Sequence, residues 1–163
     1  MTDDYRHRTS VQVRFRDIDA FGHVNNAVFF SYVELARIRY LLDVLQPDAP
    51  FDRLPLILAR VELDFRSPIA FGEEVTVTSR VDRLGRSSIS MRHRMTAGPD
   101  DRLVAEVDTV LVTYDYAVAR PMPVPDDWRR RMMEHEARSL DRKDQADHEQ
   151  TDATRPTTAA SLS

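Results

Sequence analysis

The sequence predicts an α+β domain in which one long helix packs against an antiparallel sheet. Three observations lead to this fold class. A short alternating segment near the start predicts one strand, a long apolar run predicts one buried helix, and four later segments rich in β-branched residues predict four more strands. We therefore expect a five-stranded antiparallel sheet around one long central helix, followed by a short C-terminal helix.

The first strand is expected at residues 10–17. Val11, Val13 and Phe15 alternate there with polar residues, which is typical of a strand with one buried face. The chain should then turn at 18–23, where Gly22 can adopt backbone conformations that other residues resist.

The long helix is expected at residues 27–45. Asn25 or Asn26 can cap its first turn, and Pro47 should end it because proline cannot continue the hydrogen-bond ladder. Its apolar positions cover most of its circumference, which predicts a helix buried on several sides.

The four later strands are expected at residues 56–66, 74–83, 87–96 and 103–116. The turns between them are short, so we expect antiparallel strands that neighbour one another in sequence order. The proline-rich segment 120–125 should be an extended connector. A closing helix follows at 127–138, with Asp126 as its expected cap.

The length of 163 residues indicates one domain, which we place at residues 10–138. Residues 1–9 should be flexible, and the polar segment 139–163 should be disordered because it offers little apolar surface to bury. No apolar run approaches the ~20 residues that span a bilayer. The first residues lack the apolar core of a secretion signal, so we expect a cytoplasmic protein without a membrane partner.

Composition excludes several classes of site. The net charge of −4 is spread along the chain, which argues against a nucleic-acid partner. There is no cysteine, so disulfides, thiolate metal sites and a cysteine nucleophile are excluded. The histidines show no metal-ligand spacing, and four glycines cannot form a dinucleotide or phosphate-binding loop. We expect neither a metal nor a cofactor.

The turn before the long helix concentrates the remaining polar chemistry. Asp19 lies next to the positive end of the helix, where an ionised carboxylate is favoured, although the commoner role of such an aspartate is to close the turn by accepting nearby amides. His23 could shuttle a proton or bond a ligand, or be a structural group. Asn25 and Asn26 should cap the helix, while backbone amides there could also polarise a carbonyl.

Glu34 is the other acid of interest. It lies on the helix that we expect to be buried, and a buried glutamate needs a partner. Arg37 or Arg66 could supply a purely structural ion pair.

The segment VRFRDIDAFGHVNNAVFFSYVELAR resembles the opening of the hotdog-fold acyl-CoA thioesterases, in the superfamily similar to 4-hydroxybenzoyl-CoA thioesterase. The match is to the branch with D-x-D-x-x-G-H-V-N-N before an aromatic-rich helix. The resemblance continues through LILARVELDFRSPIAFGEEVTVTSRVDRLGRSS and covers residues 10–118. It implies a hotdog fold, in which strands wrap a central helix, and subunits that pair into homodimers or homotetramers.

The resemblance also implies the roles of individual residues. Asp19 would be the catalytic nucleophile or general base, and the backbone amides of Asn26 and Ala27 would polarise the thioester carbonyl. A neighbouring subunit would complete the pocket, with Arg60 and Glu62 as possible contributors. The expected substrate-binding residues are His23, Asn25, Phe29, Glu34 and Arg60.

The resemblance implies hydrolysis of an acyl-CoA to a free acid and coenzyme A. A hotdog protein that only binds acyl thioesters, and a thioesterase acting on acyl carrier protein, stay open. A hydratase is disfavoured, because the spacing of Asp19 and His23 differs from the hydratase motif and lacks its proline. Phe21, Phe29, Phe30 and Tyr32 could line an acyl pocket or simply pack the core.

Overall fold

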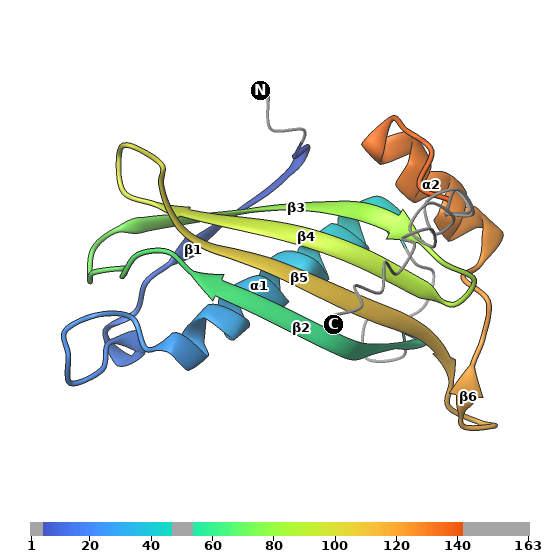
Figure 1. Ribbon diagram of the computed structural model, residues 1–163, viewed down its shortest axis with the longest axis horizontal. Helices are drawn as coiled ribbons and strands as arrows, with labels where there is room; N and C mark the ends of the chain where they lie inside the picture. Colours follow the sequence, from blue (N-terminus) through green and yellow to red (C-terminus); the bar gives the residue numbers. More distant parts are fainter. Residues whose placement is uncertain (1–4, 47–53, 142–163) are drawn as a thin grey trace, which may run out of the picture.

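The computed structural model describes residues 5–46 and 54–141. Its helices are α1 (Asn26–Tyr40), which continues through a π-helical turn at Leu41–Leu45, and α2 (Asp126–Glu136). Its strands are β1 (His7–Gln12), β2 (Leu56–Phe65), β3 (Glu74–Leu84), β4 (Ser88–Ala97), β5 (Arg102–Asp115) and the short β6 (Arg120–Pro121). Figure 1 shows α1 lying across one face of the sheet, with α2 at the end away from the start of α1. The predicted fold class is confirmed.

The strand order in the antiparallel sheet is β1-β3-β4-β5-β2, and β6 adds a short pair to β5. The expected neighbours β3, β4 and β5 pair in sequence order, but the expected pairing of β2 with β3 was wrong. The connector between them turns instead toward the loop that precedes α1. Ile69 accepts a hydrogen bond from the Val24 N–H at 2.8 Å, and Ala70 bridges to His23. β2 therefore lies at a free edge of the sheet.

The first strand lies earlier than predicted. It begins at His7, within the segment expected to be flexible, and both His7 and Thr9 are buried. Residues Phe15–Asp17 form a 3₁₀ turn, so Phe15 is 82 % exposed instead of sharing the buried face of the strand. The physical reason is that Asp17 accepts hydrogen bonds from the backbone and the guanidinium of Arg14, which turns the chain.

Helix α1 is buried on one side in the single chain. Its buried side chains face the sheet: Phe29, Tyr32, Val33, Ala36, Arg37 and Tyr40. The expectation of burial on several sides was wrong, because Phe30 and Leu35 are exposed, as is Leu42 in the following turn. These apolar side chains leave part of the helix surface uncovered.

Helix α2 closes the far end of the sheet. Trp128, Met132 and Glu136 are its buried residues. It begins after Pro125 without the side-chain cap expected from Asp126, and proline favours the extended backbone that leads into the helix. Leu140 is also buried, so the domain extends past the predicted boundary at 138.

Two expectations lie outside the described residues: the helix stop at Pro47 and the greater part of the polar segment, 142–163. The described part of α1 and its π-helical turn ends at Leu45, and Gln46 follows in the left-handed conformation. In the described part of the chain, every helix is too short or too polar to cross a bilayer.

Candidate active site

Asp19 lies in a tight loop between the 3₁₀ turn and α1. The Asp19 N–H donates to the His23 carbonyl at 2.9 Å, and the Gly22 N–H donates to the Asp19 carbonyl at 3.0 Å. Gly22 has φ of +82°, a conformation that glycine adopts without steric cost. The loop thereby presents the Asp19 side chain beside the start of α1.

The Asp19 carboxylate has one oxygen engaged. Oδ1 accepts from the Phe21 N–H at 2.9 Å, which is the local turn that the sequence allowed as a structural role. Among the residues that the structure describes, no donor reaches Oδ2. The carboxylate is therefore oriented by its own loop while one oxygen stays open to a ligand or water.

The start of α1 supplies hydrogen-bond donors. Asn25 is the N-cap: its Oδ1 accepts from the Ala27 N–H at 2.9 Å, so the amide expected at Ala27 is already engaged. Within residues 5–46 and 54–141, no acceptor takes the Asn26 N–H. Because helix N-termini carry partial positive charge, Asn26 is the better placed of the two expected amides to polarise a carbonyl oxygen.

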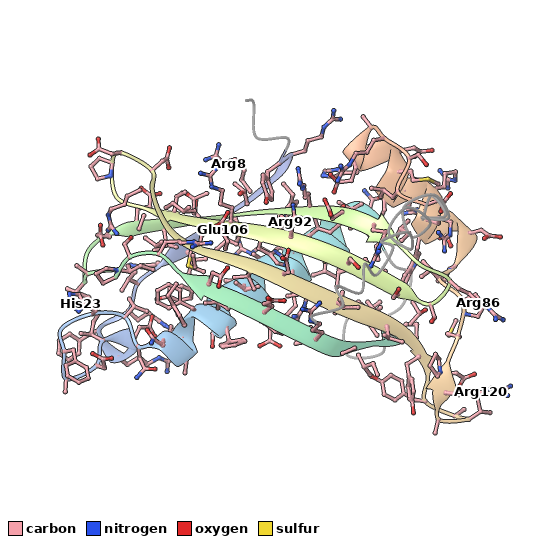
Figure 2. The ribbon with its side chains drawn as sticks, viewed as in Figure 1. Arg8, His23, Arg86, Arg92, Glu106 and Arg120 are labelled. Carbon is pink, nitrogen blue, oxygen red and sulfur yellow. The ribbon has the colours of Figure 1, made fainter. Side chains whose placement is uncertain are left out.

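A cleft of about 410 Å³ joins these groups. It lies between the Asp19 loop, the first turn of α1 and the end of β2, and its lining residues are Asp19, Phe21, His23, Val24, Asn26, Phe29, Phe65, Arg66, Ser67 and Pro68. Figure 2 shows His23 at the end of the molecule opposite Arg86 and Arg120. The cleft combines a carboxylate, an imidazole and an amide with an aromatic wall.

Two aromatic residues form much of that wall. Phe29 is 2 % exposed, and its ring meets that of Phe65 edge to face with centroids 5.1 Å apart. At the rim, Arg66 pairs with Glu106 at 2.8 Å and with Asp64 at 3.3 Å. The arginine charge is thus shared with two surface acids.

A slightly larger cleft, about 470 Å³, lies between β1 and the turn before β3. Its charged residues are Glu73 and Glu74. Glu73 is committed to structure: it accepts from the Ala70 N–H at 2.7 Å and from Arg102 at 2.6 Å, and these bonds hold the pKa of its carboxyl below the usual range. The cleft at Asp19 is chemically the better candidate.

The structure brings together part of the predicted set. Asp19, His23, Asn26 and Phe29 line one cleft, and Asn25 holds the helix end beside it. Of the other aromatic residues considered for the acyl pocket, Phe21 also lines this cleft, whereas Phe30 is exposed elsewhere.

Glu34 and Arg60 lie outside this cleft in the single chain. The Glu34 side chain is 62 % exposed, contrary to the expected burial, because it points away from the covered side of α1. Its ion pair with Arg37 at 3.4 Å confirms the predicted structural partner. Arg60 is exposed on the free edge strand β2 and pairs with Glu62.

A third, smaller cleft of about 260 Å³ contains Glu34 and Arg37. Its remaining wall is mostly apolar, formed by Ile38, Leu41, Leu54, Leu56, Ile57, Leu58, Leu111 and Tyr116. Arg37 is buried, and this burial lowers the pKa of its guanidinium although the Glu34 carboxylate opposes the shift. The sequence pattern indicated Arg37 only as a partner of Glu34, not as a buried residue of a cleft.

Asp17 is the last residue of the strand predicted at residues 10–17, and no role beyond closing that strand was expected for it. Its carboxylate is 2 % exposed and accepts the Tyr32 hydroxyl at 2.8 Å. The available signal was an acid two positions before Asp19, but spacing alone does not show which acid of the pair is buried.

Comparisons with known proteins identify the family. A family model for the thioesterase-like superfamily matches residues 13–132. The chain belongs to the thioesterase-like superfamily. Its antiparallel sheet and long helix form the hotdog fold of these proteins, and the expectation of a thioester hydrolase is confirmed at the level of the family.

Individual relatives agree with this assignment. The chain is 22 % identical over 130 residues to the long-chain acyl-CoA thioesterase FadM of Escherichia coli (strain K12), covering 77 % of this chain and 96 % of FadM. A thioesterase from Thermus thermophilus, solved with coenzyme A and Zn, is 43 % identical with a TM-score of 0.76, covering 85 % of this chain and 99 % of that one. A putative acyl-CoA thioesterase from Xanthomonas campestris is 35 % identical with a TM-score of 0.60, covering 67 % and 92 %.

Proposed function

We propose that this thioesterase-family chain hydrolyses an acyl-CoA to a free carboxylic acid and coenzyme A, with Asp19 as its catalytic carboxylate. The observation that carries the proposal is the shared cleft of the Asp19 side chain and the first turn of α1. The Thermus relative was solved with coenzyme A, and FadM acts on acyl-CoA, which supports the same class of substrate here.

The reaction requires a carboxylate that activates water or attacks the thioester carbon, and a hydrogen-bond donor that stabilises the carbonyl oxygen. As general base, Asp19 takes a proton from water while the water oxygen attacks the thioester carbon; the C–S bond then breaks, and the leaving sulfur takes that proton from Asp19 to give the free thiol. As nucleophile, an Asp19 oxygen would instead bond to the thioester carbon and the C–S bond would break to release the thiolate; water would then hydrolyse the mixed anhydride, restoring the Asp19 carboxylate and supplying the proton that the thiolate takes. In either route the carbonyl oxygen gains negative charge.

The Asn26 N–H is the proposed donor to that oxygen. A helix N-terminus directs a free amide and a positive dipole toward negative charge, and one such donor typically contributes about 3 kcal/mol of transition-state stabilisation. The Ala27 N–H could bind the carbonyl oxygen only after its hydrogen bond to Asn25 Oδ1 breaks. We therefore assign Ala27 to the capped turn and not to the carbonyl site. His23 at the cleft is proposed to bind the substrate.

We place the acyl group along the aromatic wall. Phe29 and Phe65 give the inner cleft an apolar surface, and a volume of about 410 Å³ lies within the range of small-molecule sites. The proposed reaction involves no nucleic acid, membrane or cofactor. We propose that it takes place in the cytoplasm, which is consistent with the composition.

A homodimer is proposed to complete the site. In the described part of the chain β2 is an edge strand of the sheet. It exposes Leu58 and Phe65, and α1 exposes Phe30 and Leu35. Two-fold antiparallel pairing of two β2 strands would cover this edge. It would bring the Phe65 end of one β2 strand beside the Leu56 end of the other, so that a neighbouring subunit supplies Arg60 and the cleft that contains Glu34 and Arg37.

Acyl carrier protein is the alternative carrier. An acyl-acyl carrier protein thioesterase of Arabidopsis thaliana is 25 % identical over 125 residues, covering 76 % of this chain and 65 % of its own length. A panel of acyl-CoA and acyl carrier protein thioesters, assayed for thiol release with a disulfide reagent, decides between the carriers. Catalytic release from acyl-CoA supports the proposal. Tight acyl-CoA binding by calorimetry without thiol release would contradict it and favour a binding protein.

A further inference from the structure

The Asp19 loop is anchored by a buried acid that does not line the cleft. The Asp17 carboxylate accepts from the Arg14 backbone N–H at 2.9 Å, from Arg14 Nη2 at 2.9 Å and from the Tyr32 hydroxyl at 2.8 Å. Arg14 Nε adds contacts of 3.1 and 3.2 Å to its two oxygens. A carboxylate that is 2 % exposed thus has its acceptor capacity filled by two residues.

The backbone of Asp17 fixes both stems of the loop. Its N–H donates to the Arg14 carbonyl at 2.9 Å, and its carbonyl accepts from the Asn25 N–H at 2.8 Å. Ile18 and Val24 form the next bridge inward. The chain therefore leaves Asp17, forms the loop that carries Asp19, and returns to Asp17 at the residue that caps α1.

Tyr32 connects this anchor to the helix. It lies on the buried side of α1, two turns from the helix start, and its ring is 2 % exposed. Burial raises the pKa of the Tyr32 hydroxyl, and its bond to Asp17 raises it further, so it stays a donor. Burial alone would raise the pKa of the Asp17 carboxyl, but the bonds from Arg14 and Tyr32 outweigh it and hold the pKa below its usual range.

We propose that Asp17, Tyr32 and Arg14 form a positioning unit that holds the Asp19 carboxylate in place relative to the Asn26 N–H. The inference rests on the proposed function of Asp19. Asp17 does not contact the cleft, so it acts through the loop and not on the substrate. Displacing a catalytic group by about 1 Å can cost roughly 100-fold in rate, which makes such an anchor kinetically important.

Helix α1 offers a matched control. Tyr40 lies on the same buried side, and its hydroxyl donates to the buried Glu136 carboxylate at 2.6 Å, at the end of α1 away from the loop. Tyr32→Phe and Tyr40→Phe each remove one buried hydroxyl–carboxylate bond from the same helix. We expect both to lower Tm by several degrees, and we expect Tyr32→Phe alone to lower kcat, by about 10-fold or more, with a much smaller change in KM.

Hydrogen–deuterium exchange of residues 18–26 supplies a readout independent of activity. We expect faster exchange in Tyr32→Phe and unchanged exchange in Tyr40→Phe. Asp17→Asn removes the charge that faces Arg14 and replaces one acceptor oxygen with a donor, so it should lower kcat and speed the exchange at least as much as Tyr32→Phe. Equal loss of kcat in the two tyrosine variants, or unchanged kcat and exchange in Tyr32→Phe, would overturn the positioning role.

Failure of the proposed function has a different signature. If the wild-type protein releases no thiol from any acyl thioester, Asp19 is not a hydrolytic residue here and the catalytic part of the inference falls with it. The exchange measurement still decides whether the unit orders the loop. If wild type is active and Tyr32→Phe is fully active with a protected loop, the positioning unit is wrong and the thioesterase function stands.

Discussion

Glu136 should be the residue through which α2 stabilises the domain. Its carboxylate is 1 % exposed, and Oε1 accepts both the Tyr40 hydroxyl at 2.6 Å and the Val81 backbone N–H at 2.8 Å. These bonds link α2 to α1 and to β3. Glu136→Ala removes the shared acceptor and leaves two buried donors without it.

The expected cost follows from those two donors. An unsatisfied buried donor costs about 1–3 kcal/mol, so the variant should lose about 4 kcal/mol of unfolding free energy. For a chain of this size, about 2–4 °C of Tm is lost per kcal/mol, which predicts a Tm lower by about 10 °C. Glu134→Ala is the control: Glu134 lies on the exposed side of the same helix and pairs with Arg130 at 3.1 Å, so its loss should cost at most about 0.5 kcal/mol.

Thermal and urea unfolding at one fixed protein concentration measure both variants, since association would otherwise change the apparent stability. Circular dichroism at 222 nm and intrinsic fluorescence of Trp128 on α2 report the transition. A loss below about 1 kcal/mol in Glu136→Ala, or equal losses in the two variants, would refute the assignment of Glu136 as the anchor of α2.

Two further predictions concern pH and association. Burial, together with the Arg37 charge, lowers the pKa of His93 to about 3, so the unfolded state binds the extra proton as pH falls below about 6.5. Unfolding free energy should therefore fall by about 1 kcal/mol per unit from pH 6.5 to 5, and His93→Gln should lose most of this dependence in urea titrations; an equally steep fall in the variant would contradict it. Leu58→Asp, on the exposed edge strand, should convert the proposed dimer to a monomer by light scattering, whereas Val118→Asp, exposed near β6, should not. An unchanged mass for Leu58→Asp would argue against pairing through β2.

The fold could be predicted because its main elements carry local signals. Val75, Val77 and Val81 alternate with polar residues in β3, and these side chains are buried as that pattern predicts. Strand order was harder to predict, since the pairing of β2 with β5 depends on contacts between residues that are far apart in the chain. The short turn before β3 suggested a hairpin, but its carbonyl at Ile69 bonds Val24 instead.

The site was predictable as a segment but not in its detailed geometry. The concentration of Asp19, His23 and two asparagines before a helix indicated the candidate site, and the family resemblance favoured a catalytic role for Asp19 over a purely turn-forming one. The structure shows that Asp19 forms the turn through one carboxylate oxygen, and this is compatible with the proposed catalytic role. The buried role of Asp17 depends on Tyr32, fifteen positions away, and no local pattern expresses that contact.

The expected burial of α1 on several sides was the main wrong prediction with functional consequences. Apolar residues on all sides of a helix indicate coverage, but they do not say whether the same chain provides it. Phe30 and Leu35 stay exposed in the single chain, and Glu34 with them. The sequence pattern therefore anticipates a covering surface that the proposed second subunit would supply.

The turnover number of Asp19→Asn tests the central claim most directly. Asparagine keeps an Oδ1 acceptor for the Phe21 N–H, so the loop should hold its shape while the carboxylate is lost. Asp115→Asn is the matched control, because Asp115 Oδ1 accepts the Ala117 N–H at 2.9 Å in a similar turn remote from the cleft. On the best acyl-CoA substrate, we predict that Asp19→Asn lowers kcat by at least about 100-fold while Asp115→Asn stays within about twofold of wild type. Wild-type turnover in a correctly folded Asp19→Asn protein would contradict the assignment of Asp19 as the catalytic carboxylate.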